Sequence, residues 1–342
     1  MRGLTLADAL KGSGAECHFI CREHPGNLVE HIRSKGYPVH ALPCMAFARE
    51  AAAPVHATWL GASQEQDAAA CADVLRELQP DWLIVDHYGL DARWESVLKP
   101  HYRKLLVIDD LADRPHQCDL LLDQTFGREP EDYKPWVRRD CTLLCGSQFA
   151  LLRPEFAALR PYSLRRREQA KLEHLLITMG GVDQGNATSQ VLQALKHSEL
   201  PDDCRITVVM GATAPWLAEV RQQAAQMPWP TMVLVGVSEM AQLMADSDLA
   251  IGAAGSTSWE RCCLGLPTVM AVLADNQQKV ARGLELAGAV HVLPGSGQFL
   301  ECLPPLLRSL ALSPEQRVSM SQAAQSIVDG RGVATVIQHL EL

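Results

Sequence analysis

Short apolar runs alternate with stretches of helical periodicity along almost the whole chain of 342 residues. Runs rich in leucine, isoleucine and valine, separated by helices, are typical of parallel sheets that are covered on both faces. We therefore predict an α/β protein with doubly wound parallel sheets. The predicted strands are Glu16–Cys21, Val39–Leu42, Trp82–Asp86, Leu105–Asp109, Leu120–Asp123 and Thr142–Cys145 in the first half, and Leu175–Met179, Ile206–Met210, Met232–Val235, Leu249–Ile251, Thr268–Val272 and Val290–Leu293 in the second.

The length of the chain predicts two domains. Domains usually contain roughly 100–200 residues, so this chain exceeds a single ordinary core. We predict domains at residues 1–157 and 174–315, joined by a basic, polar linker at residues 158–173. A solvated charged helix would also explain the linker residues, and the two interpretations are compatible.

Both ends of the chain have a helical pattern. Residues 316–342 form such a pattern, interrupted near Gly330 and Gly332, and we expect these helices to pack back toward the first domain. At the other end, Arg2–Leu10 has helical periodicity and precedes the predicted strand Glu16–Cys21. Because a sheet of this type usually begins with a strand, we expect that the first strand of the first domain is missing from the sequence.

The charge and hydropathy of the chain restrict its partners. The formal net charge is −9, whereas a nucleic-acid-binding protein needs a basic face, so we expect no nucleic-acid partner. No apolar run approaches the roughly 20 residues of a membrane span, so we expect no membrane partner. We expect a cytoplasmic protein, and a monomer is compatible with these features.

Cysteines and histidines cluster near the start of the chain, at Cys17, His18, Cys21 and His24. On a strand, Cys17 and Cys21 face one way and His18 the other, so these side chains do not converge on one ion. Most other cysteines lie in apolar runs and are predicted to be reduced core residues. We predict no metal site and no cofactor.

A glycine-rich segment follows the predicted strand Leu175–Met179. Its candidate ligand-binding residues are Gly180, Gly181, Asp183 and Asn186. Glycines let a ligand approach the backbone closely, and the N-terminus of the following helix favours an anion. The segment lacks the lysine of a P-loop, so a plain strand-to-helix turn is the alternative interpretation.

A second segment of small residues follows Leu249–Ile251 and contains Gly255, Ser256 and Thr257. Small and hydroxyl-bearing residues at this position can also bind an anion. Glu260 lies one helical turn further on, where its carboxylate could accept hydrogen bonds from a ribose diol. Alternatively, Glu260 stabilises only the helix dipole.

A third group of polar residues follows Thr268–Val272. The amides of Asn276 and Gln277 can both donate to and accept from sugar hydroxyls or phosphate. A helix cap made by Asp275 or Asn276 is the alternative.

In the first half, Asp86-His87-Tyr88-Gly89 ends a predicted strand, where acid–base groups would face a ligand. We consider Tyr88 the more exposed candidate, and His87 could equally be a structural histidine. Asp109 and Asp110 end the next predicted strand and are either catalytic or structural.

Several blocks of the sequence, in order, resemble one known family. The chain is similar to the UDP-2,4-diacetamido-2,4,6-trideoxy-β-L-altropyranose hydrolases of pseudaminic acid biosynthesis, which are related to the GT-B glycosyltransferases that make lipid II. The resemblance covers nearly the whole chain. It rests on Met1-Arg2 with Leu4-Thr5-Leu6-Ala7, Cys21-Arg22-Glu23-His24-Pro25-Gly26-Asn27, Asp86-His87-Tyr88-Gly89, Ile108-Asp109-Asp110-Leu111-Ala112, Tyr133 onward to Gly146, Ala150-Leu151-Leu152-Arg153-Pro154-Glu155-Phe156, Met179-Gly180-Gly181-Val182-Asp183 and Gly255-Ser256-Thr257.

The resemblance implies two Rossmann-like domains that bind a UDP-sugar in the cleft between them, with UDP held mainly by the second. It implies metal-independent hydrolysis with inversion at the anomeric carbon, in a pathway that supplies glycans of flagellin or the cell surface. The implied roles are diphosphate binding by Gly255 and Ser256, ribose binding by Glu260, and placement on the sugar side for Asn276, Gln277, Arg153 and Tyr88.

One feature departs from the family pattern. The family begins with a strand and a G-x-G-H-x-x-R loop whose histidine is the proposed general base. Met1-Arg2 aligns with the end of that motif, so we expect the histidine to lie upstream of Met1 and consider Tyr88 and His87 as the catalytic candidates in this sequence. The alternatives are an upstream start or an inactive form. A GT-B glycosyltransferase, a related epimerase and a non-catalytic nucleotide-sugar binder also stay open.

Overall fold

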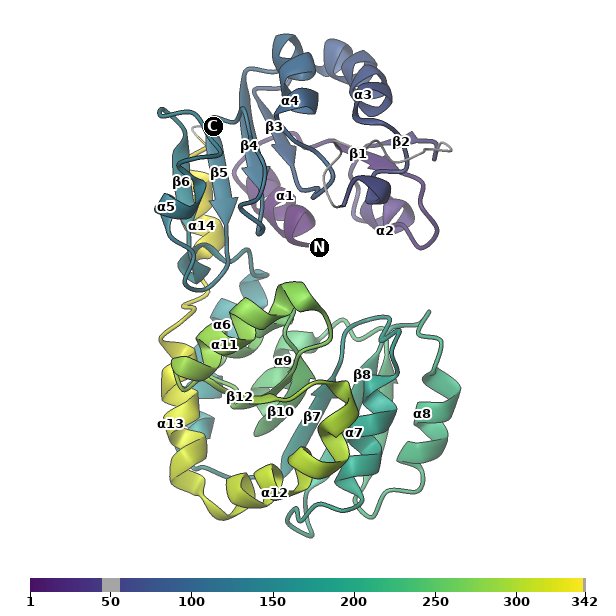
Figure 1. Ribbon diagram of the computed structural model, residues 1–342, viewed down its shortest axis with the longest axis vertical. Helices are drawn as coiled ribbons and strands as arrows, with labels where there is room; N and C mark the ends of the chain where they lie inside the picture. The colour runs from purple at the N-terminus through teal and green to yellow at the C-terminus, as the bar shows by residue number, and fades with distance from the viewer. Residues whose placement is uncertain (45–55, 341–342) are drawn as a thin grey trace. The chain divides into compact units, whose positions relative to one another are not determined.

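The computed structural model describes residues 1–44 and 56–340, which form two compact units (Figure 1). The first unit contains Met1–Leu151 and the C-terminal segment that begins at Gly332, and the second contains Leu152–Arg331. The sheets of both units are parallel and are packed with helices. The predicted α/β architecture of two parallel-sheet domains is therefore confirmed.

The first unit contains two parallel sheets. β3, β4, β5 and β6 form a four-stranded sheet in that order, and β1 pairs with β2. The strands are β1 Phe19–Arg22, β2 Val39–Leu42, β3 Trp82–Val85, β4 Lys104–Ile108, β5 Leu120–Asp123 and β6 Thr142–Cys145. The helices are α1 Arg2–Gly12, α2 Val29–Ser34, α3 Gln64–Leu78, α4 Ala92–Leu98, α5 Pro130–Tyr133 and α14 Gly332–Gln338, with 3-10 turns η1 Ala57–Trp59, η2 Lys99–His101 and η3 Ser147–Phe149.

Helix α1 connects the two sheets of the first unit. Its Leu6 and Leu10 pack in a cluster with residues of β4, including Leu106. Its Leu4 and Ala7 belong to a second cluster that includes residues of α2, β1 and β2. No backbone ladder joins β1 to β3 among the residues that the structure describes. The two sheets are therefore held together by side-chain packing on a shared helix.

The second unit has one six-stranded parallel sheet in the order β12-β11-β10-β7-β8-β9. Its strands are β7 His174–Thr178, β8 Arg205–Met210, β9 Thr231–Val235, β10 Leu249–Ala253, β11 Thr268–Ala271 and β12 Val290–Leu293. Its helices are α6 Pro154–Arg167, α7 Ala187–Leu195, α8 Leu217–Ala224, α9 Met240–Asp246, α10 Thr257–Cys263, α11 Gln278–Leu286, α12 Phe299–Leu312 and α13 Pro314–Gln325, with 3-10 turns η4 Asp275–Gln277 and η5 Ser296–Gln298.

The residues predicted as a linker, 158–173, lie inside the second unit, and residues up to Arg167 belong to α6. These residues do not form an exposed linker, because basic side chains of this helix bind groups inside the unit. Arg167 is buried and donates hydrogen bonds to the carbonyl oxygens of Met244 at 3.0 Å and Leu264 at 2.9 Å. Because the last carbonyl groups of a helix lack intrahelical partners, a guanidinium group can satisfy them. The basic residues here therefore fasten α6 to the ends of α9 and α10.

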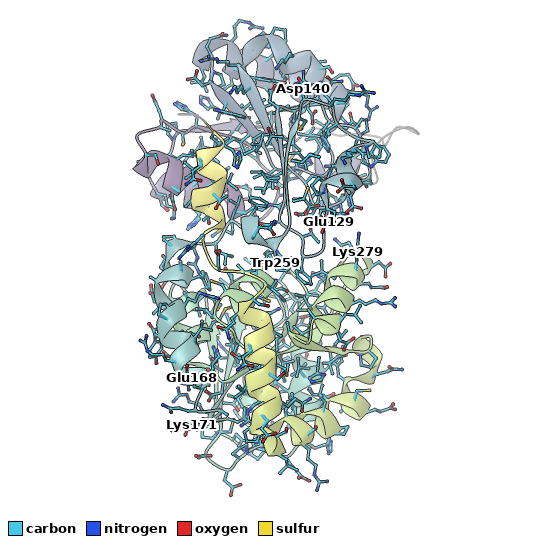
Figure 2. The ribbon with its side chains drawn as sticks, turned by 90° about the vertical axis from the view of Figure 1, so that its left-hand side faces the viewer. Glu129, Asp140, Glu168, Lys171, Trp259 and Lys279 are labelled. Atoms are coloured by element: carbon cyan, nitrogen blue, oxygen red, sulfur yellow. The ribbon has the colours of Figure 1, made fainter. Side chains whose placement is uncertain are left out.

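The basic segment is also distant from the carboxyl ends of the strands. Glu168 and Lys171, just after α6, lie at one end of the second unit, and Trp259 of α10 lies at the other (Figure 2). Lys171 precedes β7, so this end holds the amino ends of the strands.

The two C-terminal helices pack in different units. α13 contacts α10 and α12 in the second unit, whereas α14 contacts α1 in the first (Figure 1). Gly332 begins α14 where a Cβ atom would lie 2.4 Å from the carbonyl oxygen of Ala150, so this close approach requires glycine. The return to the first unit is thus made by α14. Residues 341–342 of the predicted segment lie outside the described residues.

Candidate functional site

The two glycine-rich loops singled out in the sequence follow neighbouring strands. Gly252 of β10 lies opposite Thr178 of β7 in the sheet. From β7 the chain runs outward to β8 and β9, and it then continues at β10 on the other side of β7. The order of strands therefore reverses between β7 and β10. Open parallel sheets bind ligands in the crevice at such a switch point, outside the carboxyl ends of the strands.

In the loop after β7, Asp183 makes its contacts within the protein. Its carboxylate accepts hydrogen bonds from the backbone N–H groups of Ala187 at 2.9 Å and Thr188 at 2.8 Å. These are the first N–H groups of α7, so Asp183 caps the helix itself. Asn186 donates a hydrogen bond to Glu219 at 3.2 Å. Both side chains thus shape the loop.

The glycines of the same loop leave its backbone accessible. A Cβ atom on Gly180 or Gly181 would meet no other atom within 4 Å, and Gly180 has a φ of +100°. The N–H group of Gly211, after β8, donates to the carbonyl oxygen of Gly181 at 2.9 Å. A Cβ atom on Gly211 would lie 2.2 Å from that oxygen. Gly211 was not among the residues predicted for this site, although it is a glycine placed directly after a predicted strand.

The loop after β10 presents unused donors. In the described part of the chain, the backbone N–H groups of Gly255, Ser256 and Thr257 donate no hydrogen bond. Ser256 is exposed, and a Cβ atom on Gly255 would meet nothing within 4 Å. This loop can therefore bind an anion through its backbone.

Glu260 lies in the first turn of α10, close to the same loop. Burial raises the pKa of its carboxyl group, and the positive charges of Arg153 and Arg261 oppose this shift. A partly buried carboxylate between two cations can accept hydrogen bonds from two neighbouring hydroxyl groups of a sugar.

A pocket of about 200 Å³ lies beside Arg153, and Ser238 and Glu239 are among the residues that line it. Arg153 donates a hydrogen bond to the carbonyl oxygen of Ser238 at 3.3 Å. The loop after β9 was not singled out in the sequence. The residue that could have marked this loop in the sequence is Gly236, which follows a predicted strand and has a φ of +63° in the structure.

Asn276 and Gln277 lie in η4, after β11. Gln277 accepts a hydrogen bond from the backbone N–H of Leu273 at 2.9 Å, so its carbonyl oxygen holds the loop. Asn276 is exposed. Since β11 is the neighbour of β10, both residues follow the strand next to the switch point.

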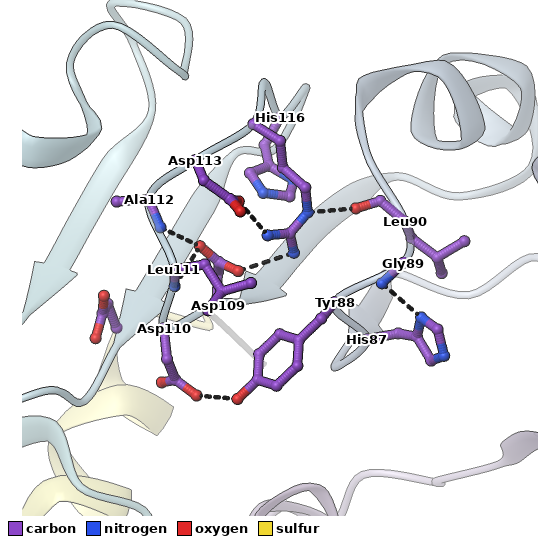
Figure 3. A network of polar contacts seen from close by, with 12 residues as sticks. His87, Tyr88, Gly89, Leu90, Asp109, Asp110, Leu111, Ala112, Asp113 and His116 are labelled. Atoms are coloured by element: carbon purple, nitrogen blue, oxygen red, sulfur yellow. Dashed lines mark hydrogen bonds and ion pairs between the residues drawn. The ribbon is translucent and has the colours of Figure 1, made fainter. Parts of the chain in front are cut away.

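The first unit has its own polar cluster at the carboxyl ends of β3 and β4 (Figure 3). The hydroxyl group of Tyr88 donates a hydrogen bond to Oδ2 of Asp110 at 2.5 Å. Arg2 forms ion pairs with Asp110 and with Asp86, the latter at 2.7 Å. Burial raises the pKa of both Tyr88 and Asp110. At Asp110, Oδ1 is buried and has no hydrogen-bond partner among the described residues.

His87 points away from Tyr88 and contacts its own loop (Figure 3). Its Nδ1 accepts a hydrogen bond from the backbone N–H of Gly89 at 3.0 Å. Burial lowers the pKa of His87, so the neutral ring is favoured. These contacts favour a structural role for His87 over a catalytic one.

Asp109 and Asp110 have different surroundings. Asp109 is fully buried, pairs with Arg114 at 2.8 Å and accepts a hydrogen bond from Tyr133 at 2.8 Å. Burial would raise the pKa of Asp109, but the charge of Arg114 and the hydrogen bonds from Ala112 and Tyr133 outweigh it and lower this pKa. Asp109 is therefore a structural carboxylate, and Asp110 is the carboxylate that is partly exposed.

Aromatic rings lie next to the Tyr88 cluster. The ring of His56 is 4.5 Å from that of Trp59 and 5.8 Å from that of Tyr88, measured between centroids. Trp59 is 55% exposed, so one face of this aromatic group is available to a ligand. Trp59 and His56 were not among the predicted site residues, because no local sequence pattern distinguishes them.

The described residues contain no group of three or more histidine, cysteine, aspartate or glutamate side chains that could hold a metal ion. No helix in the described ranges has both the length and the apolar character of a membrane span.

Comparisons with known proteins identify a matching family model and several relatives of the chain. Residues 174–336 match the family model described as the glycosyltransferase family 28 C-terminal domain. An uncharacterized protein of Methanocaldococcus jannaschii is 27% identical over 207 residues, which are 59% of this chain and 42% of that protein. The UDP-2,4-diacetamido-2,4,6-trideoxy-β-L-altropyranose hydrolase of Campylobacter jejuni is 29% identical over 217 residues, which are 63% of this chain and 75% of the hydrolase.

Solved structures show the same fold. The crystal structure of Acinetobacter baumannii MurG has a TM-score of 0.67 and 15% sequence identity, and the match covers 99% of this chain and 95% of MurG. The architecture of two parallel-sheet α/β domains is therefore that of the GT-B fold.

Proposed function

We propose that the chain hydrolyses UDP-2,4-diacetamido-2,4,6-trideoxy-β-L-altropyranose to UDP and the free 2,4-diacetamido sugar, a step of pseudaminic acid biosynthesis. Support comes from the 29% identity to the hydrolase of Campylobacter jejuni and from the sequence blocks that resemble that family. The GT-B fold supports a nucleotide-sugar substrate more broadly.

The second unit is proposed to bind UDP. The observation that carries this proposal is that two loops with accessible glycines, after β7 and β10, lie at one switch point of the sheet. We assign the diphosphate to the backbone N–H groups of Gly255, Ser256 and Thr257. Gly180 and Gly181 would allow it to approach the loop after β7. The predicted contributions of Asp183 and Asn186 become indirect, because their side chains hold that loop in shape.

Glu260 is proposed to bind the ribose diol. Its carboxylate lies one turn beyond the anion-binding loop and near the charge of Arg153. Arg153, Asn276 and Gln277 are proposed to contact the sugar part of the substrate, since they also follow or adjoin the carboxyl ends of strands in this sheet.

Asp110 is proposed as the base that activates water. Hydrolysis forms a bond between the water oxygen and the anomeric carbon and breaks the bond between that carbon and the phosphate oxygen, which leaves with the electron pair as UDP. The water proton would pass to the carboxylate of Asp110, whose side chain is partly exposed. A raised pKa makes this carboxylate a better base. Tyr88 stays protonated and orients Asp110 through its hydrogen bond.

A glycosyltransferase is the second candidate, because residues 174–336 match the C-terminal domain model of glycosyltransferase family 28. The two functions would share the nucleotide site and differ in the acceptor, which is water for the hydrolase and a second hydroxyl compound for the transferase.

The test is to incubate the purified chain with the UDP-diacetamido sugar in water enriched in ¹⁸O. We expect UDP and a free sugar that carries ¹⁸O at the anomeric carbon. UDP release that requires an added acceptor would instead establish a transferase. Binding of the substrate with no release under either condition would establish a non-catalytic binder.

A further inference from the structure

Arg261 carries a buried charge beside the proposed diphosphate loop. Its residue exposure is 1%, and it is the largest of the fully buried side chains described. Among the described residues no carboxylate forms an ion pair with it, and its Nε has no hydrogen-bond partner. An arginine buried in this way is unusual, because buried charges are normally paired.

The guanidinium group of Arg261 contacts both ends of the loop after β10. Nη2 donates hydrogen bonds to the carbonyl oxygen of Ala253 at 2.7 Å and to Oγ of Ser258 at 3.2 Å. Nη1 donates to Oγ1 of Thr257 at 3.3 Å. One side chain thus joins the last residue of β10 to the first turn of α10 and fixes the loop between them.

Gly252 makes room for this guanidinium group. A Cβ atom on Gly252 would lie 2.4 Å from Nη1 of Arg261 and 3.1 Å from the carbonyl oxygen of Thr178 in β7. The absence of a side chain at Gly252 therefore lets the guanidinium group fit. The packed residues extend from α10 to β7, the strand on the other side of the switch point.

The charge of Arg261 is only partly compensated. Burial lowers its pKa to about 10, which the negative charge of Glu260 opposes. All of its hydrogen-bond acceptors are neutral oxygen atoms. Taking a cation out of water without a counter-ion is unfavourable, so an anion bound near this loop would gain stabilisation from it.

We propose that Arg261 is a positioning residue for the diphosphate of the nucleotide sugar, which holds the loop after β10 in its binding conformation and supplies the positive potential beneath it. Arg261 does not contact the ligand in this account, and it acts through Ala253, Thr257 and Ser258. The inference rests on the proposed function, because it assumes that this loop binds the diphosphate.

The test compares UDP with uridine, which lacks the phosphates. Their dissociation constants are measured by calorimetric titration, with competition by uridine where its binding is weak. In Arg261→Gln, we expect UDP affinity to fall about three- to thirtyfold, the order expected for a residue that acts on a ligand without contacting it, while uridine affinity is nearly unchanged. Arg261→Lys keeps the charge and the length of the side chain and should lie between the wild type and the glutamine variant.

Two further variants separate this role from a general loss of stability. Gly252→Ala keeps the arginine but displaces it, so it should reproduce the loss of UDP affinity. Arg167→Gln is the matched control, since Arg167 is also buried and donates to carbonyl oxygens in the same unit but lies away from the loop. It should lower stability without changing the ratio of the two affinities.

The possible outcomes distinguish a failure of the inference about Arg261 from a failure of the proposed function. If folded Arg261→Gln binds UDP as the wild type does, or loses uridine and UDP affinity equally, the proposal is wrong although the proposed function stands. If the wild-type chain does not bind UDP, the proposed function itself fails.

Discussion

The hydroxyl group of Tyr88 donates a 2.5 Å hydrogen bond to Asp110, so two side chains that follow different strands, β3 and β4, are joined by a direct polar contact. Tyr88 was a catalytic candidate from the sequence, and the structure adds a carboxylate partner with a raised pKa. We propose that Asp110 is the base and that Tyr88 orients it. Replacing either residue should therefore lower the rate of hydrolysis.

Replacing Asp110 by asparagine should lower kcat about 10²–10⁴-fold, the usual effect of losing a general base, with a smaller change in KM. Tyr88→Phe should give a weaker loss of kcat, because the base is kept but less well oriented. UDP release in a coupled assay measures both.

Asp113→Asn is the matched control for these variants. Asp113 is an aspartate of the loop that follows Asp110, and its side chain is about half exposed and paired with Arg114. Its removal should leave kcat unchanged. A loss in Asp113→Asn equal to that in Asp110→Asn would contradict the role of Asp110.

His87 should stay neutral when exposed histidines become protonated. Its pKa in the folded state is lowered, whereas an unfolded histidine titrates near 6.5. As pH falls below about 6.5, the unfolded chain therefore binds a proton that the folded chain does not, and the free energy of unfolding of the first unit decreases. Imidazole titration by NMR measures the pKa directly.

His87→Asn should remove this part of the pH dependence, since the amide oxygen can still accept the hydrogen bond from Gly89. A pKa of His87 equal to or above 6.5 would argue against the structural role and return the residue to the catalytic candidates.

Trp59→Ala should raise KM for the sugar substrate several-fold with little effect on stability. The side chain is 55% exposed and lies beside the rings of His56 and Tyr88, where an aromatic face can stack on the apolar face of a sugar. Trp59→Phe should keep most of the affinity. Steady-state kinetics of the two variants provide the comparison, and an unchanged KM in Trp59→Ala would exclude a contact with the sugar.

Arg160→Met should destabilise the second unit by about 2–3 kcal/mol, because a partly buried charged donor would be removed from several carbonyl oxygens. Arg160 donates to Gln325 at 2.8 Å and Val328 at 3.0 Å, and also to Cys263. Arg165→Met is the control on the same helix. Arg165 is exposed, so its replacement should change stability by less than about 0.5 kcal/mol.

Denaturant unfolding with separate probes for the two units measures these changes. Equal effects of Arg160→Met and Arg165→Met would show that the hydrogen bonds of Arg160 do not hold α6 in place.

The strands could be predicted because most of their residues are apolar and form short continuous runs. Val39–Leu42, Leu120–Asp123, Thr142–Cys145 and Val290–Leu293 have the predicted bounds. β1 begins at Phe19 rather than at Glu16, since the polar residues that precede it do not pair with β2. The switch point followed from strand order, which no local pattern contains, and only the structure brings the loops after β7 and β10 together.

Side-chain partners could not be predicted in the same way. Asp183 and Asn186 are of residue types that often bind ligands, but Asp183 accepts hydrogen bonds from N–H groups of the protein and Asn186 donates one to Glu219. The arginines of α6 resemble a solvated linker in sequence, because a basic side chain that caps distant helix ends has no local signature. Arg261 is similar, since its role depends on the space left by Gly252.

The central claim is that the switch-point site of the second unit binds UDP, and calorimetric titration of UDP into the wild type, Glu260→Ala and Glu301→Ala tests it most directly. Glu301 is the control, because it is an exposed glutamate in the first turn of α12 in the same unit. We predict binding of one UDP per chain, at least tenfold weaker in Glu260→Ala and unchanged in Glu301→Ala. Absence of UDP binding in the wild type, or equal affinity in all three proteins, would contradict the account.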